Sequence, residues 1–284
     1  MATLRQLRTR VTSIGNIQRV TNAMYMVAAA KMRRAQDAIE SARPYAEQID
    51  RTLRRIQGSV ESDHALFRQR EVRRLSVVVV SADRGLCGGF NGNVGRQARL
   101  ELESQTGVEV ELTTVGRKGR DFLASRGFEA SRHHADVFRQ LEFGTAAQIA
   151  RGLTSDYAAE RTDRALLIFS EFRSVASQVP VVRQLLPIAP PEDQDPGAGT
   201  CIFEPGPERL LEALVPRHVS FQVWRALLET NAGFFAAQMA AMDNATKNAG
   251  DLITELTREV NKERQSSITL ELMDIIGGAE AVAQ

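Results

Sequence analysis

Cysteine and long apolar runs are scarce in this sequence. Its 284 residues include two cysteines, Cys87 and Cys201, which lie far apart and have no metal-ligand spacing. We therefore expect no disulfide framework, and this usage is typical of a reducing compartment. No apolar run approaches the roughly eighteen residues of a membrane-spanning helix. The 36 Lys and Arg nearly balance the 35 Asp and Glu, which argues against a bulk polyanion as partner.

The balanced total hides opposite charges at the two ends of the sequence. Residues 1–58 carry eleven Lys and Arg against four Asp and Glu, whereas residues 208–284 carry seven against eleven. Such ends favour pairing with each other or with different partner surfaces, and two independently solvated faces are the alternative. The arginines between Arg5 and Arg19 are not interleaved with aromatic residues, so a charged helix face that meets acidic partners fits better than nucleic-acid binding.

The sequence also lacks the known phosphate-binding motifs. The loop from Asp83 to Asn93 holds Gly85, Gly88, Gly89 and Gly92 between an expected strand and an expected helix, where phosphates often bind. It matches neither the dinucleotide fingerprint nor the P-loop, because no Gly-Lys-Ser/Thr is present. A nucleotide site and a tight strand-to-helix turn both remain open from these residues alone.

Other candidate catalytic groups are isolated. His133 and His134 are adjacent, so in a strand they would face opposite ways, and we expect a surface pair rather than a metal site. Cys87 has no neighbouring histidine, so a small buried residue in a packed turn is the better interpretation. No pair of carboxylates has a spacing that selects a catalytic site. The indication of an enzyme in these residues is therefore weak, and we expect no cofactor.

The N-terminal part shows one long helical pattern. Its apolar positions alternate spacings of three and four, as in the seam of a coiled coil. A helix over residues 3–56 would be about 80 Å long, more than a compact domain of this size can bury. Pro44 and Gly15 weaken the pattern without ending it. The seam positions are Leu4, Leu7, Val11, Ile14, Gln18, Thr21, Tyr25, Ala28, Met32, Ala35, Ile39, Ala42, Ala46, Ile49, Leu53 and Ile56.

A second helical pattern runs from about Glu208 to the C-terminus. Its seam continues to Val260, after which the apolar face moves to Ile268, Leu272, Ile275 and Ala279, a register slip. An ordinary bundle with breaks at Gly233 and Gly250 is the alternative. The seam positions are Leu211, Leu214, His218, Phe221, Arg225, Leu228, Ala232, Phe235, Met239, Met242, Thr246, Ala249, Ile253, Leu256 and Val260.

Between the two helices the pattern changes to strands alternating with helices. This alternation predicts a mainly parallel, helix-covered sheet, that is, a Rossmann-like α/β domain. Residues 190–199 are rich in proline, glycine and acidic residues, which predicts an exposed loop. We expect strands over 75–81, 108–115, 165–172 and 179–186, and helices over 91–104, 117–125 and 145–160. The domains are therefore expected at 1–58, 70–200 and 208–284.

Several motifs in this order resemble the gamma subunit of F-type ATP synthase, its central rotor stalk. The segment from Ala23 to Met32 is similar to the family's N-terminal signature, and Asp83–Asn91 to the turn of its α/β domain. Ser177–Pro180 and Gln184–Pro187, Met242–Thr246, and the stretch from Arg264 to Ala279 complete the match. Asn22, where the family commonly has Lys, and Gly15 depart from it and put individual rotor contacts in doubt. The chain lacks the cysteine pair inserted in chloroplast relatives.

The resemblance implies a shaft rather than an enzyme. The terminal helices would form an antiparallel coiled coil inside a ring of three alpha and three beta subunits, with the α/β domain near the epsilon subunit and the membrane c-ring. Rotation would then couple ion flow to ATP synthesis or hydrolysis, with the catalysis in the partners. The resemblance also implies a peripheral position on the cytoplasmic side of a bacterial inner membrane. The coupling ion and the direction of catalysis stay open.

The resemblance also assigns partner contacts to individual residues. Ile268, Leu272, Ile275 and Ile276 would form an apolar tip that turns in the bearing of the ring. Arg264 and Gln265 would contact a loop of a beta subunit, and Met24 would meet the ring from the shorter helix. Two alternatives remain: a nucleotide-binding enzyme that uses the Gly85–Gly92 loop, and a free-standing coiled-coil scaffold.

Overall fold

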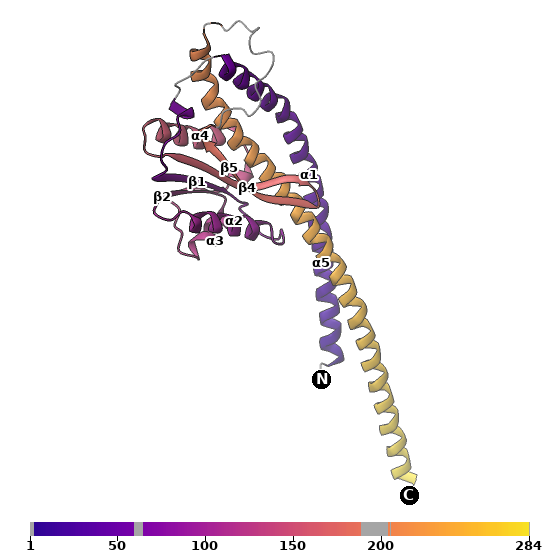
Figure 1. The fold of residues 1–284 in the computed structure, drawn as a ribbon. Helices are drawn as coiled ribbons and strands as arrows, with labels where there is room; N and C mark the ends of the chain where they lie inside the picture. Colours follow the sequence, from indigo (N-terminus) through magenta and orange to yellow (C-terminus); the bar gives the residue numbers. More distant parts are fainter. Residues whose placement is uncertain (1–2, 60–64, 189–203, 205, 284) are drawn as a thin grey trace. The chain divides into compact units, whose positions relative to one another are not determined.

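The computed structural model describes residues 3–59, 65–188, 204 and 206–283 of the chain (Figure 1). The expected acidic loop at 190–199 and Cys201 lie outside these residues. In the described ranges no helix is both long enough and apolar enough to cross a membrane. The elements are α1 (Leu4–Ser59), η1 (Ala65–Phe67), β1 (Arg74–Val80), α2 (Phe90–Ser104), β2 (Glu109–Val115), α3 (Arg117–Ala124), β3 (Arg132–His134), η2 (Val137–Arg139), α4 (Phe143–Ala158), β4 (Arg164–Ser174), β5 (Ser177–Leu186) and α5 (Pro207–Ala283).

The five strands form one sheet in the order β3-β2-β1-β4-β5. β1 pairs in parallel with β2 and β4, β2 pairs in parallel with β3, and β5 closes the other edge antiparallel to β4. The expected mainly parallel, helix-covered sheet is therefore confirmed. The short edge strand β3 was not among the expected strands, because three residues carry too little pattern to show alternation.

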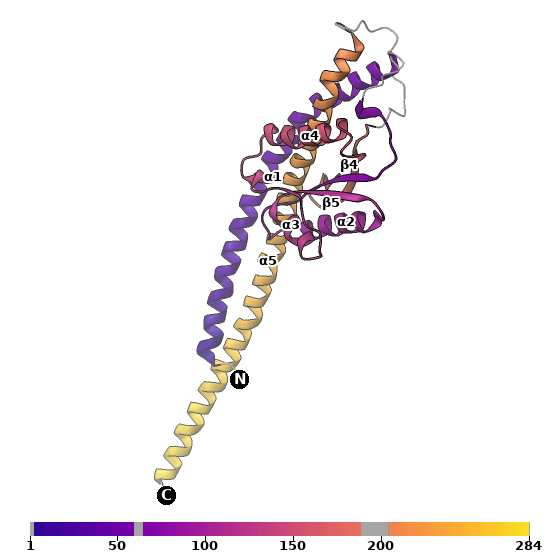
Figure 2. The same ribbon diagram turned by 90° about the vertical axis from the view of Figure 1, so that its left-hand side faces the viewer.

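Alternate residues of β1 face the two sides of the sheet. Val78 and Val80 pack in one core with α4, with α1 from Ile49 to Ile56 and with α5 from Leu211 to Leu227. Val77 and Val79 pack with α2 and α3 on the other side. Figure 2 shows α4 on one side of the strands, with α2 and α3 on the other. The near-continuous apolar run of β1 follows from this burial on both faces.

The long helices are uninterrupted. α1 continues through Pro44, and α5 continues through Gly233 and Gly250, so the alternative of a bundle with breaks at these glycines is wrong. Both long helices are thus confirmed. The chain forms two compact units, residues 1–28 with 239–284 and residues 29–238. The three-domain division at 1–58, 70–200 and 208–284 stays a prediction.

Within residues 29–238 the two helices run antiparallel. His218 Nδ1 lies 3.0 Å from Asp50 Oδ1, and the rings of Tyr45 and Phe221 are 5.3 Å apart. As the numbering rises along α1 it falls along α5, which is the antiparallel arrangement. This contact joins a carboxylate of the basic N-terminal helix to a histidine of the acidic C-terminal helix, so it does not itself show the expected pairing of the opposite net charges.

Two buried carboxylates secure the amino ends of the strands. Asp163 Oδ2 accepts hydrogen bonds from Arg73 N at 3.1 Å and Arg74 N at 2.9 Å, which joins β1 to the turn before β4. Burial alone would raise the pKa of Asp163, but these two donors and the Arg74 guanidinium outweigh it and the pKa is lowered. Asp156 pairs with Arg161 at 2.6 Å and Arg132 at 3.1 Å.

Candidate functional sites at the sheet edge and the C-terminal tip

The glycine-rich loop leaves β1 at the carboxyl edge of the parallel strands, where doubly wound folds bind ligands. The chain packs tightly against itself there. Ser81 Oγ accepts a hydrogen bond from Gly119 N at 2.7 Å, at the start of α3. Gly116 has a φ of +85°, and a Cβ at this position would lie 2.0 Å from Ser81 O. Only glycine fits this approach of two backbones.

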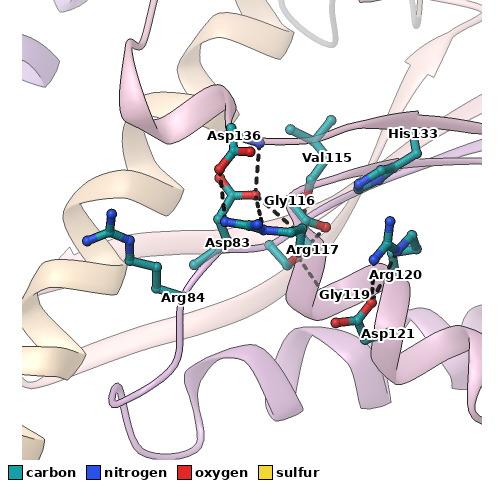
Figure 3. Close-up of polar contacts among 12 residues, drawn as sticks. Asp83, Arg84, Val115, Gly116, Arg117, Gly119, Arg120, Asp121, His133 and Asp136 are labelled. Carbon is teal, nitrogen blue, oxygen red and sulfur yellow. Dashed lines mark hydrogen bonds and ion pairs between the residues drawn. The ribbon is translucent and has the colours of Figure 1, made fainter.

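Asp83 joins the loop after β1 to the start of α3 and to the turn after β3 (Figure 3). Its Oδ1 accepts hydrogen bonds from Arg117 N and Asp136 N, both at 3.1 Å, and its side chain is buried. Arg117 Nη2 also donates to Asp136 Oδ1 at 2.9 Å. The backbone donor at the start of α3 that could bind an anion is therefore already bonded to a carboxylate of the same chain.

Asn91 satisfies the other side of the loop. Its Oδ1 accepts from Ala82 N at 3.0 Å, and its Nδ2 donates to Arg84 O at 3.0 Å and Cys87 Sγ at 3.3 Å. Cys87 is buried, as expected, and burial raises the pKa of its thiol. These contacts are those of a self-contained turn. They favour the tight-turn interpretation over the nucleotide site.

The adjacent histidines His133 and His134 lie in the edge strand β3. His133 Nδ1 lies 3.0 Å from Thr114 Oγ1, and burial lowers the pKa of His134. Both are half-buried in the edge strand β3, which pairs with β2. Across the residues that the structure describes, no three His, Cys, Asp or Glu side chains are grouped to hold a metal.

The two terminal segments pair within their own unit. Thr21 Oγ1 and Thr246 Oγ1 are 2.8 Å apart, inside the apolar seam. A Cβ at Gly250 would lie 3.0 Å from Gln18 Nε2, so the helices are close at this level. Because the partner number falls as the α1 number rises, this stretch is also antiparallel. The coiled coil expected from the two seams is confirmed here by direct contacts.

This register leaves the end of α5 without a partner in α1. Continuing the pairing from Gln18 to Leu4, where α1 begins, brings the opposite position to about residue 264. The half-buried positions Glu263 and Ser267 keep the spacing of the seam, whereas the apolar residues that follow lie off it. The apolar face therefore leaves the seam after Val260, as the predicted register slip requires.

Six large apolar side chains on this end are exposed to between 48% and 68%. At about 100° per residue they cover an arc of roughly 220°, and Ser267, Glu271 and Asp274 occupy the remainder. An ordinary amphipathic helix has an apolar stripe only somewhat over 100° wide. We call residues 264–276 the C-terminal tip. The six residues are Ile268, Leu270, Leu272, Met273, Ile275 and Ile276.

The structure brings together most of the expected contact residues. Ile268, Leu272, Ile275 and Ile276 lie on the C-terminal tip with exposed Arg264 and Gln265. Met24 is half-buried on α1 and is not part of the tip. Their contacts with partner subunits stay predictions.

Sequence reasoning missed Leu270 and Met273 because it followed a single face of the helix. It also missed the exposed Ile17, Val20 and Val27, which with Met24 form a stripe beside the seam of α1. Counting apolar residues around the whole helix circumference would have found both groups.

Comparisons with known proteins cover nearly the whole chain. The family described as ATP synthase (ATP-synt) matches residues 3–282. The chain is 45% identical over 289 residues to an ATP synthase gamma chain of Anaeromyxobacter sp. (strain Fw109-5), covering 99% of this chain and 100% of that one. This chain belongs to the ATP synthase gamma chain family. A gamma chain of Pelotomaculum thermopropionicum is 43% identical over 284 residues, covering 99% of this chain and 100% of the relative.

Chains in solved structures of ATP synthases share the fold. A chain of the Tetrahymena thermophila mitochondrial ATP synthase central stalk and c-ring superposes with a TM-score of 0.60 at 26% identity, covering 80% of this chain and 99% of its own. A chain of the Euglena gracilis mitochondrial ATP synthase has a TM-score of 0.73 at 20% identity, covering 98% of this chain and 94% of its own. These likenesses concern the fold, and nothing in the described loop geometry favours the nucleotide-binding alternative.

Proposed function

We propose that this gamma-family chain is the central rotor shaft of an F-type ATP synthase. In this role it is not itself a catalyst. It turns inside a ring of alpha and beta subunits and couples rotation of the c-ring to the nucleotide sites of the beta subunits. The observation that carries the proposal is the C-terminal tip, a single helix with an apolar arc of roughly 220°.

A surface of this shape needs a partner on several sides at once. A second helix covers only a narrow stripe, as in a two-stranded coiled coil. Six exposed large apolar side chains on one short stretch also exceed the isolated apolar residues of ordinary surfaces. A sleeve of protein around the helix would bury the whole arc, and a sleeve of non-directional apolar contacts also lets the helix turn. A ring of subunits provides such a sleeve.

The remaining contacts are assigned on the same basis. Ile268, Leu272, Ile275 and Ile276 bear on the ring, and the neighbouring Arg264 and Gln265 donate polar contacts to a beta subunit. Met24 and the exposed side chains beside it meet the ring from α1. Contact with a ring at two levels would hold the shaft against tilting.

The unit of residues 29–238, which contains the sheet, makes the remaining partner contacts of the proposed assembly. It contacts the epsilon subunit and the c-ring, so the chain is a peripheral component of a membrane-associated complex. We place this complex on the cytoplasmic side of a bacterial inner membrane. The loop after β1 serves this role as a rigid turn rather than as a ligand site, because Asp83 and Asn91 satisfy its donors.

The test is reconstitution of this chain with its alpha and beta subunits. We expect an active ATPase that contains one copy of the chain per ring, while the isolated chain gives no heat signal on titration with ATP. A variant truncated after Val260 should assemble and couple poorly, although its sheet domain stays folded. Tight ATP binding by the isolated chain would favour the enzyme alternative. A stable homodimer that ignores the ring would favour the scaffold, and unchanged ATP-driven pumping by the truncated variant would refute the role of the tip.

A further inference from the structure

The hairpin of β4 and β5 extends past its neighbour in the sheet. The pairing of β1 with β4 ends at Ile168, whereas the pairing of β4 with β5 continues to Ser174 opposite Ser177. The outer part of the hairpin therefore has no parallel neighbour beside β4. It contacts α5 instead (Figure 1).

The buried carboxylate of Glu229 makes this contact between α5 and the hairpin. Its Oε2 accepts a hydrogen bond from Phe172 N of β4 at 3.2 Å, and its Oε1 accepts one from Arg225 Nε at 2.6 Å. The residue is only 5% exposed. A charge at this depth is costly unless both oxygens are bonded, so the hairpin and the helix must keep one relative orientation to satisfy it.

One helical turn further along α5, Gly233 lets a ring approach the helix backbone. A Cβ at Gly233 would lie 2.9 Å from Phe90 Cε2 and 3.4 Å from Gln178 Cγ. Phe90 is buried at the start of α2, and its ring lies edge-on to Phe234 with centroids 6.3 Å apart. Side chains from α2 and β5 thus fit against α5 at a position where only hydrogen leaves room.

We infer that Glu229 and Gly233 form a key that fixes the rotation of α5 about its own axis against the sheet. We call this pair, with Phe172 N and Phe90, the Glu229–Gly233 key. The apolar core along α5 from Leu211 to Leu227 packs the helix against the sheet through contacts that are not directional. A directional hydrogen bond and an interlocking contact resist turning directly. The key is therefore a place where torque passes between the sheet and the shaft. This inference rests on the proposed rotor function.

The experiment uses the complete chain in a reconstituted ATP synthase. A bead on the sheet domain reports the torsional stiffness of the rotor through its angular fluctuations, and vesicles report ATP-driven ion pumping. For Glu229→Ala we expect assembly and ATP hydrolysis to persist, while torsional stiffness falls by roughly twofold and pumping against an imposed gradient falls with it. Glu229→Gln, which keeps an oxygen for Phe172 N, should fall between the wild type and Glu229→Ala. Its near-identical shape keeps the test valid if the Ala variant does not fold.

A second pair of variants tests the contact at Gly233. Gly233→Ala should soften the rotor, and adding Phe90→Leu should restore stiffness, because leucine lacks the ring atom nearest to the new Cβ. The matched controls are Glu212→Gln, an exposed carboxylate on α5, and Gly144→Ala, an exposed helical glycine with no atom within 4 Å of its added Cβ. Stiffness equal to the controls in assembled complexes would overturn the key. Failure of the unaltered chain to assemble or pump would instead overturn the rotor function itself.

Discussion

Replacing four apolar residues of the C-terminal tip by alanine should weaken binding to the ring by about a thousandfold. The variant is Ile268→Ala, Leu272→Ala, Ile275→Ala and Ile276→Ala, and alanine preserves the helix because it has the highest helix propensity. The perturbation removes apolar area without adding charge or breaking a hydrogen bond.

The magnitude follows from the exposure of these four side chains, which lies between 48% and 68% in the free chain. Each substitution removes about three carbon groups, worth about 0.8 kcal/mol each on full burial. Roughly half of that area remains to be buried by a partner, so each substitution costs about 1.2 kcal/mol. Four together cost about 5 kcal/mol, which corresponds to a factor of more than a thousand in the dissociation constant.

The assay is competition between wild-type and variant chains for a limiting amount of alpha and beta subunits, with the bound fraction read from tagged complexes. Glu271→Ala with Asp274→Ala is the control, because both residues lie in the polar sector of the same helix. We expect the control to compete within about threefold of the wild type. If the apolar variant competed as well as this control, the tip would not be buried by the ring and the bearing argument would be refuted.

Three further predictions concern stability. Gly116→Ala should lower the free energy of unfolding in urea by more than about 4 kcal/mol, because its Cβ would overlap the backbone oxygen of Ser81. The control Gly15→Ala meets no atom within 4 Å and should raise the free energy of unfolding by up to about 1 kcal/mol. Equal effects of the two substitutions would contradict the close approach of the backbones at Gly116. Asp163 has a lowered pKa in the folded chain, so its contribution is present above its unfolded pKa near 3.9 and is lost as pH falls through the folded value. Asp163→Asn should therefore flatten the pH dependence of unfolding below about pH 4, and an unchanged acid profile would count against the hydrogen bonds from Arg73 N and Arg74 N to Asp163. Thr21→Val and Thr246→Val should each cost about 1 kcal/mol while the double variant costs less than their sum, and strict additivity would show that the 2.8 Å contact is not a coupled hydrogen bond.

The sequence predicted the regular elements well because each carries a long periodic signal. The three-four spacing over α1 and α5 is strong enough to persist through Pro44 and Gly233, so both helices were predicted close to their observed bounds. The valine run of β1 likewise marks a strand buried on both faces. β3 was missed because three residues carry no measurable period.

The candidate sites were only partly predictable. The loop after β1 resembles a phosphate site in composition, and only the coordinates show that Asp83 and Asn91 already occupy its donors. The contact between Glu229 and Phe172 N joins residues far apart in sequence, and no local pattern encodes such a pairing. The apolar tip was predicted from one face, whereas its full arc needed the absence of a facing α1 segment, which depends on the register of the coil.

The composition of the unit made of residues 1–28 and 239–284 also determines when it can form. Its two helical segments are separated by more than 200 residues in the sequence, so its contacts are among the most non-local in the molecule. During synthesis the first segment leaves the ribosome long before its partner exists, so seam residues that the folded coil buries, such as Leu7 and Ala28, lack their cover until then. Residues 29–238, in contrast, contain all the pairing partners of the sheet and can fold while translation continues. The coil is thus the last part of the chain to fold, and a chaperone that shields the early helix would raise the yield of correctly paired protein.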